Sequence, residues 1–211
     1  KKGKVLVGRD TRLSGDLVES ALIAGFMSIG LDVDVAGIIP TPGVAYLTRT
    51  GDYLCGVSIS ASHNPFEYNG IKFFSSDGLK LDDSVEDEIE EKVLSTTKIY
   101  KDVTGENIGI VSRSSDFTQK YVDYLKGLTD ERFDGFEVAV DAGNGAQSFI
   151  AEEVLKSYGA KVKIINNEPN GKNINDNCGS TNPKLIEELV KSEKSHIGMS
   201  FDGDADRIIA V

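Results

Sequence analysis

The order of expected strands and helices repeats in the two halves of this 211-residue chain, and this repeat restricts the possible folds more than any other feature. In each half, an apolar strand leads through a polar loop into a helix that ends at a glycine, and a second strand follows. A helix opened by a proline then leads to a third strand and a second polar loop. Alternating strands and helices predict an α/β fold, and the repeated order predicts two copies of one unit.

The elements of the first copy follow from short apolar runs and from helix-boundary residues. The expected strands are 5–7, 33–38, 54–60 and 71–74, and the expected helices are 16–29, 41–49 and 84–94. Thr41 is expected to cap the second helix, with Pro42 as its first residue. Asp77 and Gly78 are expected to form a turn.

The second copy has the same plan. Its expected strands are 136–140, 162–165, 197–201 and 208–211, and its expected helices are 147–158 and 182–194. The glycine-bearing loop 142–146 is interpreted as structural, because isolated glycines are weak evidence of a phosphate site. The segment 96–111 and a helix near 116–128 join the copies. We therefore expect two domains, residues 1–112 and 113–211, each a three-layer α/β unit with a mixed sheet and helices on both faces.

In each copy, one polar loop follows the third strand. The two loops are Ser-Ala-Ser-His-Asn-Pro at 60–65 and Asp-Gly-Asp-Ala-Asp-Arg at 202–207. Because ligands of α/β proteins gather at the carboxyl ends of strands, we expect two adjacent domains to bring these loops to one cleft.

The second loop indicates a metal site. Asp202, Asp204 and Asp206 would repel one another unless a cation lies among them, and hard oxygen ligands suit Mg²⁺ or Ca²⁺. An EF-hand does not fit, since the sixth position of the loop is Arg207 instead of glycine and the loop lies between strands. A solvated acidic turn is the structural alternative, because Asp-Gly is ordinary turn chemistry.

Ser62 and His63 are the reactive residues of the first loop. Without other information, Ser62 is a turn or capping serine. The absence of a Gly-x-Ser-x-Gly elbow and a total of two histidines disfavour a hydrolase triad. Near a metal and several cations, however, a serine can carry a phosphoryl group. His63 is equally interpreted as an acid or base or as a residue that orients the loop.

Lys72, Arg9 and Arg12 are candidate cationic groups. Lys72 lies on an otherwise apolar strand, where it is either a solvated side chain or, with a lowered pKa, a proton-transfer group. Arg9 and Arg12 flank Asp10, so one of them can pair with this carboxylate and the other is available for phosphate.

The net charge of −11 excludes a general affinity for nucleic acid, whose phosphates would be repelled. An anionic ligand must therefore be held by a local cluster of cations. No apolar run reaches the roughly 20 residues needed to cross a bilayer, so no membrane partner is expected. The two cysteines show neither metal-ligand spacing nor a disulfide framework, and we expect a cytoplasmic protein. The oligomeric state stays open.

Taken together, the motifs resemble the α-D-phosphohexomutase superfamily. The resemblance is carried by Ser-Ala-Ser-His-Asn-Pro at 60–65, Asn-Gly-Ile-Lys at 69–72 and Asp-Gly-Asp-Ala-Asp-Arg at 202–207. Segments 8–12, 40–43, 70–78 and 174–181 are similar to the branch of this superfamily that acts on glucosamine phosphates. These segments span nearly the whole chain.

The resemblance implies a Mg²⁺-dependent enzyme in which Ser62 is the phosphorylated serine. One Mg²⁺ ion would be bound by Asp202, Asp204, Asp206 and the Ser62 phosphate, and Lys72 and Arg207 would line the transfer site. The implied reaction interconverts glucosamine 6-phosphate and glucosamine 1-phosphate through a sugar bisphosphate, which is also the activator. Such enzymes have four domains, so this chain is expected to be the first two of them and nearly inactive alone.

Three alternatives stay open. A phosphomannomutase or phosphoglucomutase would use the same chemistry on another sugar. A haloacid-dehalogenase-type phosphatase would use Asp202 as its nucleophile. A non-catalytic module that binds a metal and a phosphosugar would describe the chain in isolation.

Overall fold

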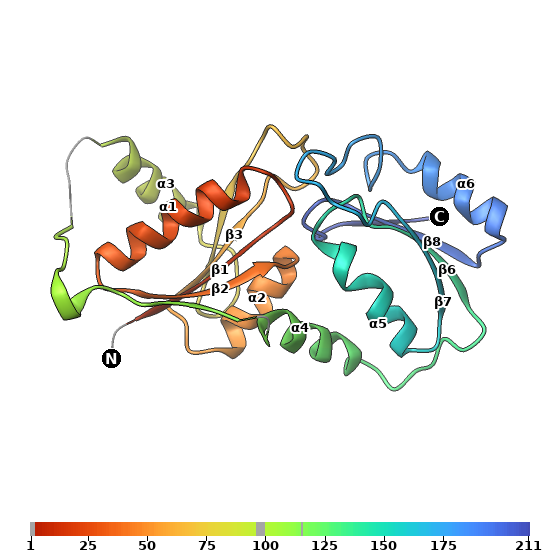
Figure 1. The fold of residues 1–211 in the computed structure, drawn as a ribbon, viewed down its shortest axis with the longest axis horizontal. Coiled ribbons are helices and arrows are strands. Elements are labelled where there is room, and N and C mark those ends of the chain that lie inside the picture. The colour runs from red at the N-terminus through yellow and green to blue at the C-terminus, as the bar shows by residue number, and fades with distance from the viewer. Residues whose placement is uncertain (1–2, 96–99, 115) are drawn as a thin grey trace.

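The computed structural model describes residues 3–95, 100–114 and 116–211 of the chain. It consists of two α/β units that lie next to each other along the longest axis of the molecule (Figure 1). Each unit contains one mixed sheet, so the predicted fold class is confirmed.

The first unit has a five-stranded sheet in the order β4-β3-β1-β2-β5. β1 pairs in parallel with β2 and β3, β2 pairs in parallel with β5, and β4 is antiparallel to β3. The strands are β1 (Lys4–Arg9), β2 (Asp32–Ile38), β3 (Cys55–Ile59), β4 (Ile71–Ser75) and β5 (Val111–Arg113). The helices are α1 (Gly15–Ser28), α2 (Thr41–Thr50) and α3 (Asp83–Leu94), and a 3₁₀ turn spans Gly105–Asn107.

Helices cover both faces of this sheet because its central strand is apolar on both sides. Val5 and Val7 of β1 pack in the core on the α1 side, whereas Leu6 between them packs in a second core with α2. Successive strand residues point to opposite faces, which explains why three consecutive apolar residues are fully buried. The connecting helix α4 (Asp116–Lys126) adds Tyr121 and Val122 to the core on the α2 side.

The second unit has a four-stranded sheet in the order β7-β6-β8-β9. β6 is parallel to β7 and β8, and β9 is antiparallel to β8. Ala151 of α5 packs with Val138 and Val140, and Ile186 of α6 packs at Gly198 of the same sheet. The elements are β6 (Glu137–Asp141), a 3₁₀ turn (Ala146–Phe149), α5 (Ala151–Ser157), β7 (Lys161–Ile165), α6 (Lys184–Glu193), β8 (Ile197–Phe201) and β9 (Ile208–Ala210).

Three expected features differ from the structure. The helix expected over 147–158 divides into a 3₁₀ turn and α5, and the first N–H of the turn, on Ala146, donates to Gly203 O of a neighbouring loop. β5 was not expected, because its Val-Ser-Arg sequence has no strand periodicity and its pairing with β2 defines it. Thr41 is the first residue of α2 and not its cap; the cap residue is Pro40.

The carboxyl ends of the two sheets face each other, and this arrangement positions the site. Thr11 Oγ1, after β1, donates to Asn144 O, after β6, at 2.6 Å. Leu13 N donates to Gly171 O at 2.8 Å, which ties the same loop to the second unit again. The loops after β3 and β8 therefore lie at the junction of the units. None of the described helices is long and apolar enough to cross a membrane.

Candidate active site

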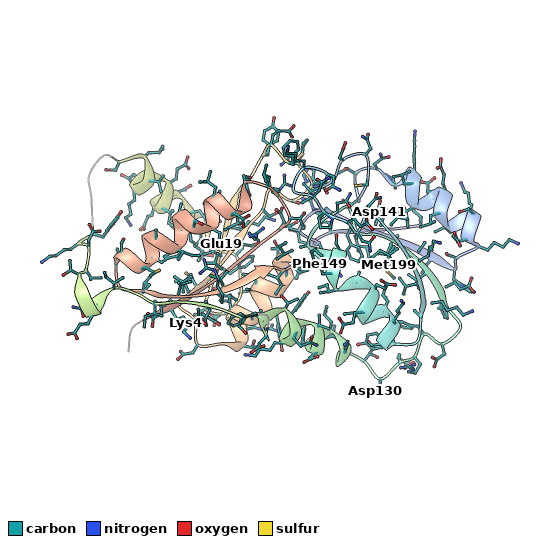
Figure 2. All side chains as sticks on the ribbon, in the orientation of Figure 1. Lys4, Glu19, Asp130, Asp141, Phe149 and Met199 are labelled. Carbon is teal, nitrogen blue, oxygen red and sulfur yellow. The ribbon has the colours of Figure 1, made fainter. Side chains whose placement is uncertain are left out.

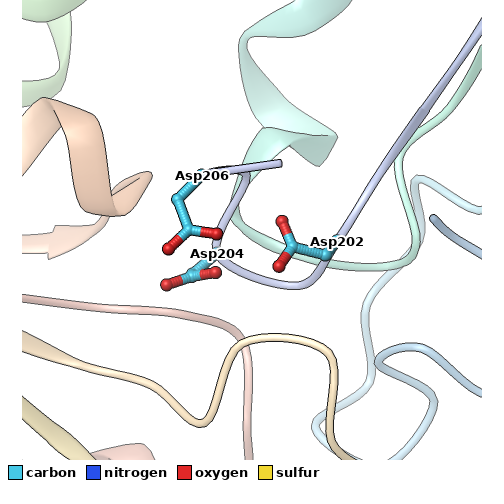
Figure 3. A group of neighbouring side chains, drawn as sticks. All are labelled: Asp202, Asp204 and Asp206. Carbon is cyan, nitrogen blue, oxygen red and sulfur yellow. The ribbon is translucent and has the colours of Figure 1, made fainter. Parts of the chain in front are cut away.

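Three carboxylates gather directly after β8. One oxygen from each of Asp202, Asp204 and Asp206 lies within 4.8 Å of the others, and their side chains surround one space (Figure 3). Asp202 and Asp204 are buried, whereas Asp206 is partly exposed. Ala205 adopts a left-handed φ of 54°, which turns the chain back toward β9. This turn brings the three carboxylates, which are close in sequence, to the same region of space.

The environment of these carboxylates fits a divalent cation. Asp204 Oδ1 is buried and has no hydrogen-bond partner among the described residues. Burial raises the pKa of Asp202, and the charges of Asp204 and Asp206 raise it further. A cation among three oxygens would relieve both the repulsion and the unpaired oxygen. The donor set is hard oxygen throughout, which suits Mg²⁺ or Ca²⁺.

Ser62 points from the first unit into this group. Its Oγ donates to Asp202 Oδ2 at 2.6 Å and accepts from Arg207 Nη2 at 2.5 Å. Ser62 has a left-handed φ of 53°, a conformation that costs a non-glycine residue of order 1–3 kcal/mol. Its N–H donates to Ser60 Oγ at 2.9 Å, which helps to hold this conformation. The loop therefore presents one hydroxyl between a carboxylate and a guanidinium.

Arg207 and His63 lie at the mouth of the site. Arg207 is half exposed, and its Nη2 lies 2.9 Å from His63 Nδ1. Its Nε is 3.4 Å from Asp202 Oδ2 and from Asp206 Oδ1. The same guanidinium thus contacts Ser62, His63 and the loop 202–207, which we call the metal loop. The structure brings all of these predicted residues together.

Lys72 on β4 also reaches the carboxylates. Its Nζ lies 2.7 Å from Asp204 Oδ2 and 3.1 Å from Asp206 Oδ2. Burial alone would lower the pKa of Lys72, but the hydrogen bonds and charges of the two carboxylates outweigh it and raise the pKa. This direction is opposite to the lowered pKa expected of a proton-transfer group. Lys72 forms ion pairs with two of the three carboxylates, and its role in the reaction stays a prediction.

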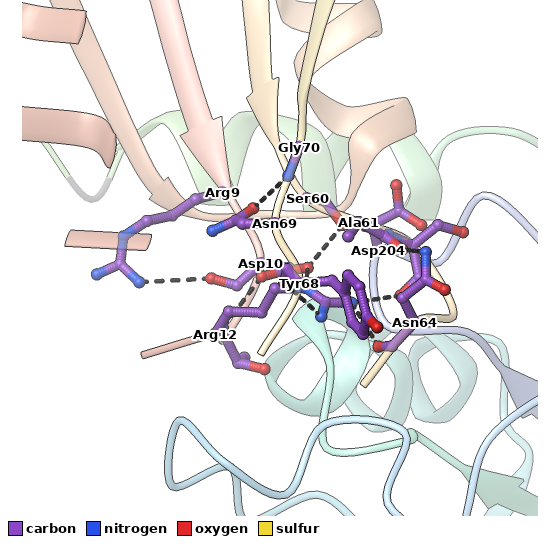
Figure 4. Close-up of polar contacts among 12 residues, drawn as sticks. Arg9, Asp10, Arg12, Ser60, Ala61, Asn64, Tyr68, Asn69, Gly70 and Asp204 are labelled. Atoms are coloured by element: carbon purple, nitrogen blue, oxygen red, sulfur yellow. Dashed lines mark hydrogen bonds and ion pairs between the residues drawn. The ribbon is translucent and has the colours of Figure 1, made fainter. Parts of the chain in front are cut away.

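Arg12 bonds to Asp10 and to the Ser62 loop, and its predicted phosphate-binding role stays a prediction without support from this geometry. The side chain is fully buried, and its Nε donates to Asp10 Oδ2 at 2.8 Å. The four remaining N–H groups donate to backbone carbonyls of the Ser62 loop (Figure 4). The acceptors are Ser62 O, Asn64 O, Pro65 O and Tyr68 O. No donor is left for a phosphate, and Arg12 instead holds the loop that carries Ser62.

Arg9 likewise forms ion pairs with carboxylates. Its side chain extends away from the Ser62 loop (Figure 4) and pairs with Asp16 at 2.6 Å and with Glu19 at 3.3 Å. Phosphate binding by Arg9 therefore also stays a prediction without support from this geometry. The side chains of consecutive strand and loop residues point in different directions, so proximity in sequence to Asp10 did not place Arg9 near Ser62.

The interpretation of loop 142–146 as structural agrees with the geometry. Asp141, labelled in Figure 2, is buried in the second unit and accepts a hydrogen bond from the N–H of Gly143. The N–H groups of Asn144 and Gly145 donate to backbone carbonyls. These N–H groups are therefore unavailable to a phosphate.

Comparison with known proteins follows the same division into two units. Residues 1–99 match the family model of phosphoglucomutase/phosphomannomutase α/β/α domain I, and residues 119–211 match the model of domain II. The chain belongs to the phosphoglucomutase/phosphomannomutase family.

Curated members of this family are similar to the chain over its whole length. The phosphoglucosamine mutase of Alkaliphilus metalliredigens is 52% identical over 211 residues, which are 100% of this chain and 47% of that protein. The phosphoglucosamine mutase of Clostridioides difficile is 51% identical over 208 residues, which are 99% of this chain and 46% of that protein. The chain thus spans about half the length of these family members.

A solved structure of the family shows the same fold. The putative phosphomannomutase from Thermus thermophilus superimposes with a TM-score of 0.83 at 26% identity, covering 100% of this chain and 48% of that one. A family protein from Burkholderia thailandensis has the same TM-score at 24% identity, covering 99% and 46%. The two-unit arrangement is therefore that of the phosphoglucomutase/phosphomannomutase family.

Two residues that contact the site were not predicted from the sequence as site residues. Thr41 donates from both its N–H and its hydroxyl to Asp204, at 2.9 and 2.6 Å. Asn175 Nδ2 donates to Ser62 O at 2.9 Å and to Asn64 O at 3.1 Å. Thr41 was interpreted as a helix cap, and Asn175 was given no role of its own within the segment 174–181. The only signal was that both lie in segments that resemble the phosphohexomutases.

Proposed function

We propose that this chain is part of a phosphoglucosamine mutase, which interconverts glucosamine 6-phosphate and glucosamine 1-phosphate. The observation that carries the proposal is the contact of the Ser62 hydroxyl with both Asp202 and Arg207 beside a group of three carboxylates. The whole-chain similarity to proteins of this name supports the choice of substrate.

In the proposed mechanism, Ser62 carries the phosphoryl group, and Asp202, Asp204 and Asp206 would hold one Mg²⁺ ion together with the serine phosphate. A bound Mg²⁺ ion would neutralise charge on the transferring phosphoryl group. The sugar hydroxyl attacks phosphorus, the phosphorus–oxygen bond to Ser62 breaks, and the proton of the sugar hydroxyl passes by way of a base to Ser62 Oγ. The resulting sugar bisphosphate, also the activator, returns its other phosphate to Ser62.

The positions of His63, Lys72 and Arg207 suggest their roles in this transfer. His63 is the candidate acid or base, because it is exposed at the mouth of the site and hydrogen-bonds Arg207. Lys72 and Arg207 would stabilise charge on the phosphoryl oxygens, since both already contact the carboxylates of the metal loop. This arrangement fits a transfer that depends on positioning and charge more than on a strong base.

Ser62 is favoured over Asp202 as the phosphate carrier. Asp202 is one of three carboxylates whose oxygens converge on one space, which assigns it to the cation and leaves the Ser62 hydroxyl, which points into the same group, to carry the phosphate. This argues against the dehalogenase-type alternative.

The test is to locate the phosphate. The 211-residue chain is incubated with Mg²⁺ and isotopically labelled glucosamine 1,6-bisphosphate, and its peptides are analysed by mass spectrometry. We expect label on Ser62, dependence on Mg²⁺, and no label in Ser62→Ala. Label on Asp202 would overturn the proposal. A panel of hexose bisphosphates, with the preference measured in the longer protein, would decide between glucosamine, glucose and mannose.

We propose that the chain alone turns over slowly. It offers a phosphate donor, a cation site and cations, but no described group is placed to hold the distal phosphate of a bisphosphate. Loss of such positioning costs several kcal/mol of transition-state stabilisation, or about a thousandfold in rate. Equal mutase rates for this chain and for the longer protein would refute this.

The predicted boundary between residues 112 and 113 falls inside β5, because Arg113 still pairs with Val35 of the first sheet. We therefore place the boundary between the two domains after Arg113. A cytoplasmic protein without nucleic-acid or membrane partners also stays our proposal, and the net charge of −11 supports the part that concerns nucleic acid.

A further inference from the structure

The two oxygens of the Asp204 carboxylate have different surroundings. Oδ2 accepts a hydrogen bond from Thr41 Oγ1 at 2.6 Å and another from Lys72 Nζ at 2.7 Å. Oδ1 is buried and has no partner within the described part of the chain. The carboxylate is therefore oriented so that one oxygen is occupied and the other is offered to the site.

Thr41 holds Asp204 at two points across the junction of the units. Its hydroxyl donates to the carboxylate, and its backbone N–H donates to Asp204 O at 2.9 Å. A second hydroxyl lies behind the first: Ser58 Oγ is 2.7 Å from Thr41 Oγ1. A hydroxyl has one hydrogen, and Thr41 gives it to Asp204, so Ser58 must donate to Thr41. All three residues are buried, which fixes this hydrogen-bonded series in one direction.

The start of α2 explains why Thr41 can do this. The first N–H groups of a helix have no partner within the helix. Pro42 has no N–H, and those of Gly43 and Val44 donate to Pro40 O. The N–H of Thr41 is the one left to point outward, toward the metal loop. The sequence Pro-Thr-Pro-Gly thus aims a single residue at Asp204.

We propose that Thr41 is a positioning residue that keeps Asp204 a monodentate ligand and thereby favours Mg²⁺ over Ca²⁺. With Oδ2 occupied, only Oδ1 is available to the cation. Mg²⁺ requires near-octahedral geometry with few protein oxygens, whereas Ca²⁺ accepts six to eight oxygens and often takes a carboxylate in bidentate fashion. The inference rests on the proposed cation site.

The test compares variants by calorimetric titration with MgCl₂ and, separately, with CaCl₂. Thr41→Val keeps the shape and the backbone N–H but removes the hydroxyl. Loss of a residue that orients a metal ligand typically costs about 10- to 100-fold in metal affinity. We expect that loss for Mg²⁺ and a smaller change for Ca²⁺, because Oδ2 would then be held by Lys72 alone and could turn to bind Ca²⁺ as well. The ratio of Ca²⁺ to Mg²⁺ affinity should therefore rise, and Thr41→Ser should restore it.

The matched control is Thr48→Val. Thr48 is buried on the same helix, and its hydroxyl donates to Val44 O at 2.7 Å, away from the metal loop. This variant should bind both ions as the unaltered chain does. Ser58→Ala is a second variant that leaves Thr41 in place, and it should change the ratio in the same direction by a smaller factor. Circular dichroism on heating verifies that each variant is folded.

The outcomes separate the inference from the proposed site. If the chain binds Mg²⁺ and both Thr41→Val and Ser58→Ala leave the ratio unchanged, Thr41 does not select the metal. If the chain binds no Mg²⁺, the proposed cation site itself is wrong. The same follows if the Asp204→Asn variant binds Mg²⁺ with the affinity of the unaltered chain. A raised ratio in Thr41→Val alongside an unaltered Thr48→Val supports the inference.

Discussion

Replacing Arg12 by methionine should destabilise the first unit strongly and loosen the loop that carries Ser62. Methionine is shorter than arginine but has a similar volume, and it has no charge and no donor. The change therefore removes the ion pair with Asp10 and the four hydrogen bonds to the loop carbonyls, while most of the volume stays filled. Asp10 would keep only Ser60 Oγ and the backbone N–H of residue 12 as donors.

The magnitude follows from the burial of Asp10. The side chains of Arg12 and Asp10 are both fully buried, and removing one partner of a buried pair typically costs about 3–5 kcal/mol, since it leaves an uncompensated charge. Burial already raises the pKa of Asp10, and Arg12 opposes this, so the pKa should rise further in Arg12→Met. The penalty applies to the charged form. It should therefore be largest at neutral pH and shrink as the pH falls toward the unfolded pKa of about 4.

The assay is urea unfolding followed by circular dichroism between pH 4 and 8, with limited proteolysis to report on loop 60–69. Arg132→Met is the control, because Arg132 forms its ion pair with Asp134 on the surface and its loss should change little. Asp10→Asn combined with Arg12→Met should recover part of the stability and lose the pH dependence. If Arg12→Met costs no more than the control, Arg12 does not hold the loop, and its assignment to phosphate would have to be reconsidered.

Two further predictions concern the second unit. Burial and the nearby Asp141 and Asp176 raise the pKa of Cys178 to about 12 from a usual value of 9.0. At pH 8 the Cys178 thiol should therefore react with Ellman's reagent about a thousandfold more slowly than in the unfolded chain. Equal rates in the folded and the unfolded chain would refute this. Because only the unfolded thiol ionises between pH 9 and 12, Cys178 should also lower the unfolding free energy as the pH rises through that range. Ile186→Ala should cost about 2–5 kcal/mol in urea unfolding, since Ile186 is fully buried on α6. At low temperature, where Ile186→Ala stays folded, Ser62 should still be labelled with phosphate. If Ile186→Ala lowers the free energy of unfolding by less than about 1 kcal/mol, α6 must repack around the smaller side chain.

The fold was predictable because its signals are local. The run Val5–Val7 is buried on both faces of a sheet, and such strands are apolar at consecutive positions. The metal loop was predictable for a related reason: three carboxylates that follow one strand must converge or be exposed. β5 lacked a local signal, because its three residues become a strand only by pairing with β2.

The roles of single residues were harder to predict when the partner is a backbone group or is distant in sequence. Arg12 binds carbonyls 50 to 56 positions away, and a carbonyl is present whatever the residue type. Thr41 precedes a proline at a helix start, so capping was the obvious interpretation, but its acceptor lies 163 positions away. The pKa of Lys72 depends on a competition between burial and two carboxylates of the other unit, which residue spacing cannot weigh.

The junction between the units has a thermodynamic consequence. A β-carbon on Gly203 would lie 2.7 Å from Ser62 O, so the two loops approach as closely as a glycine permits. Thr41 of one unit donates a hydrogen bond to Asp204 of the other, which is a proposed ligand of the cation. Cation affinity and docking of the units are then linked, and such linkage is reciprocal. A cation at one hundred times its dissociation constant would resist separation of the units by up to about 2.7 kcal/mol. Any mutation that loosens the junction should be detectable as weaker cation binding, even when both sheets remain intact.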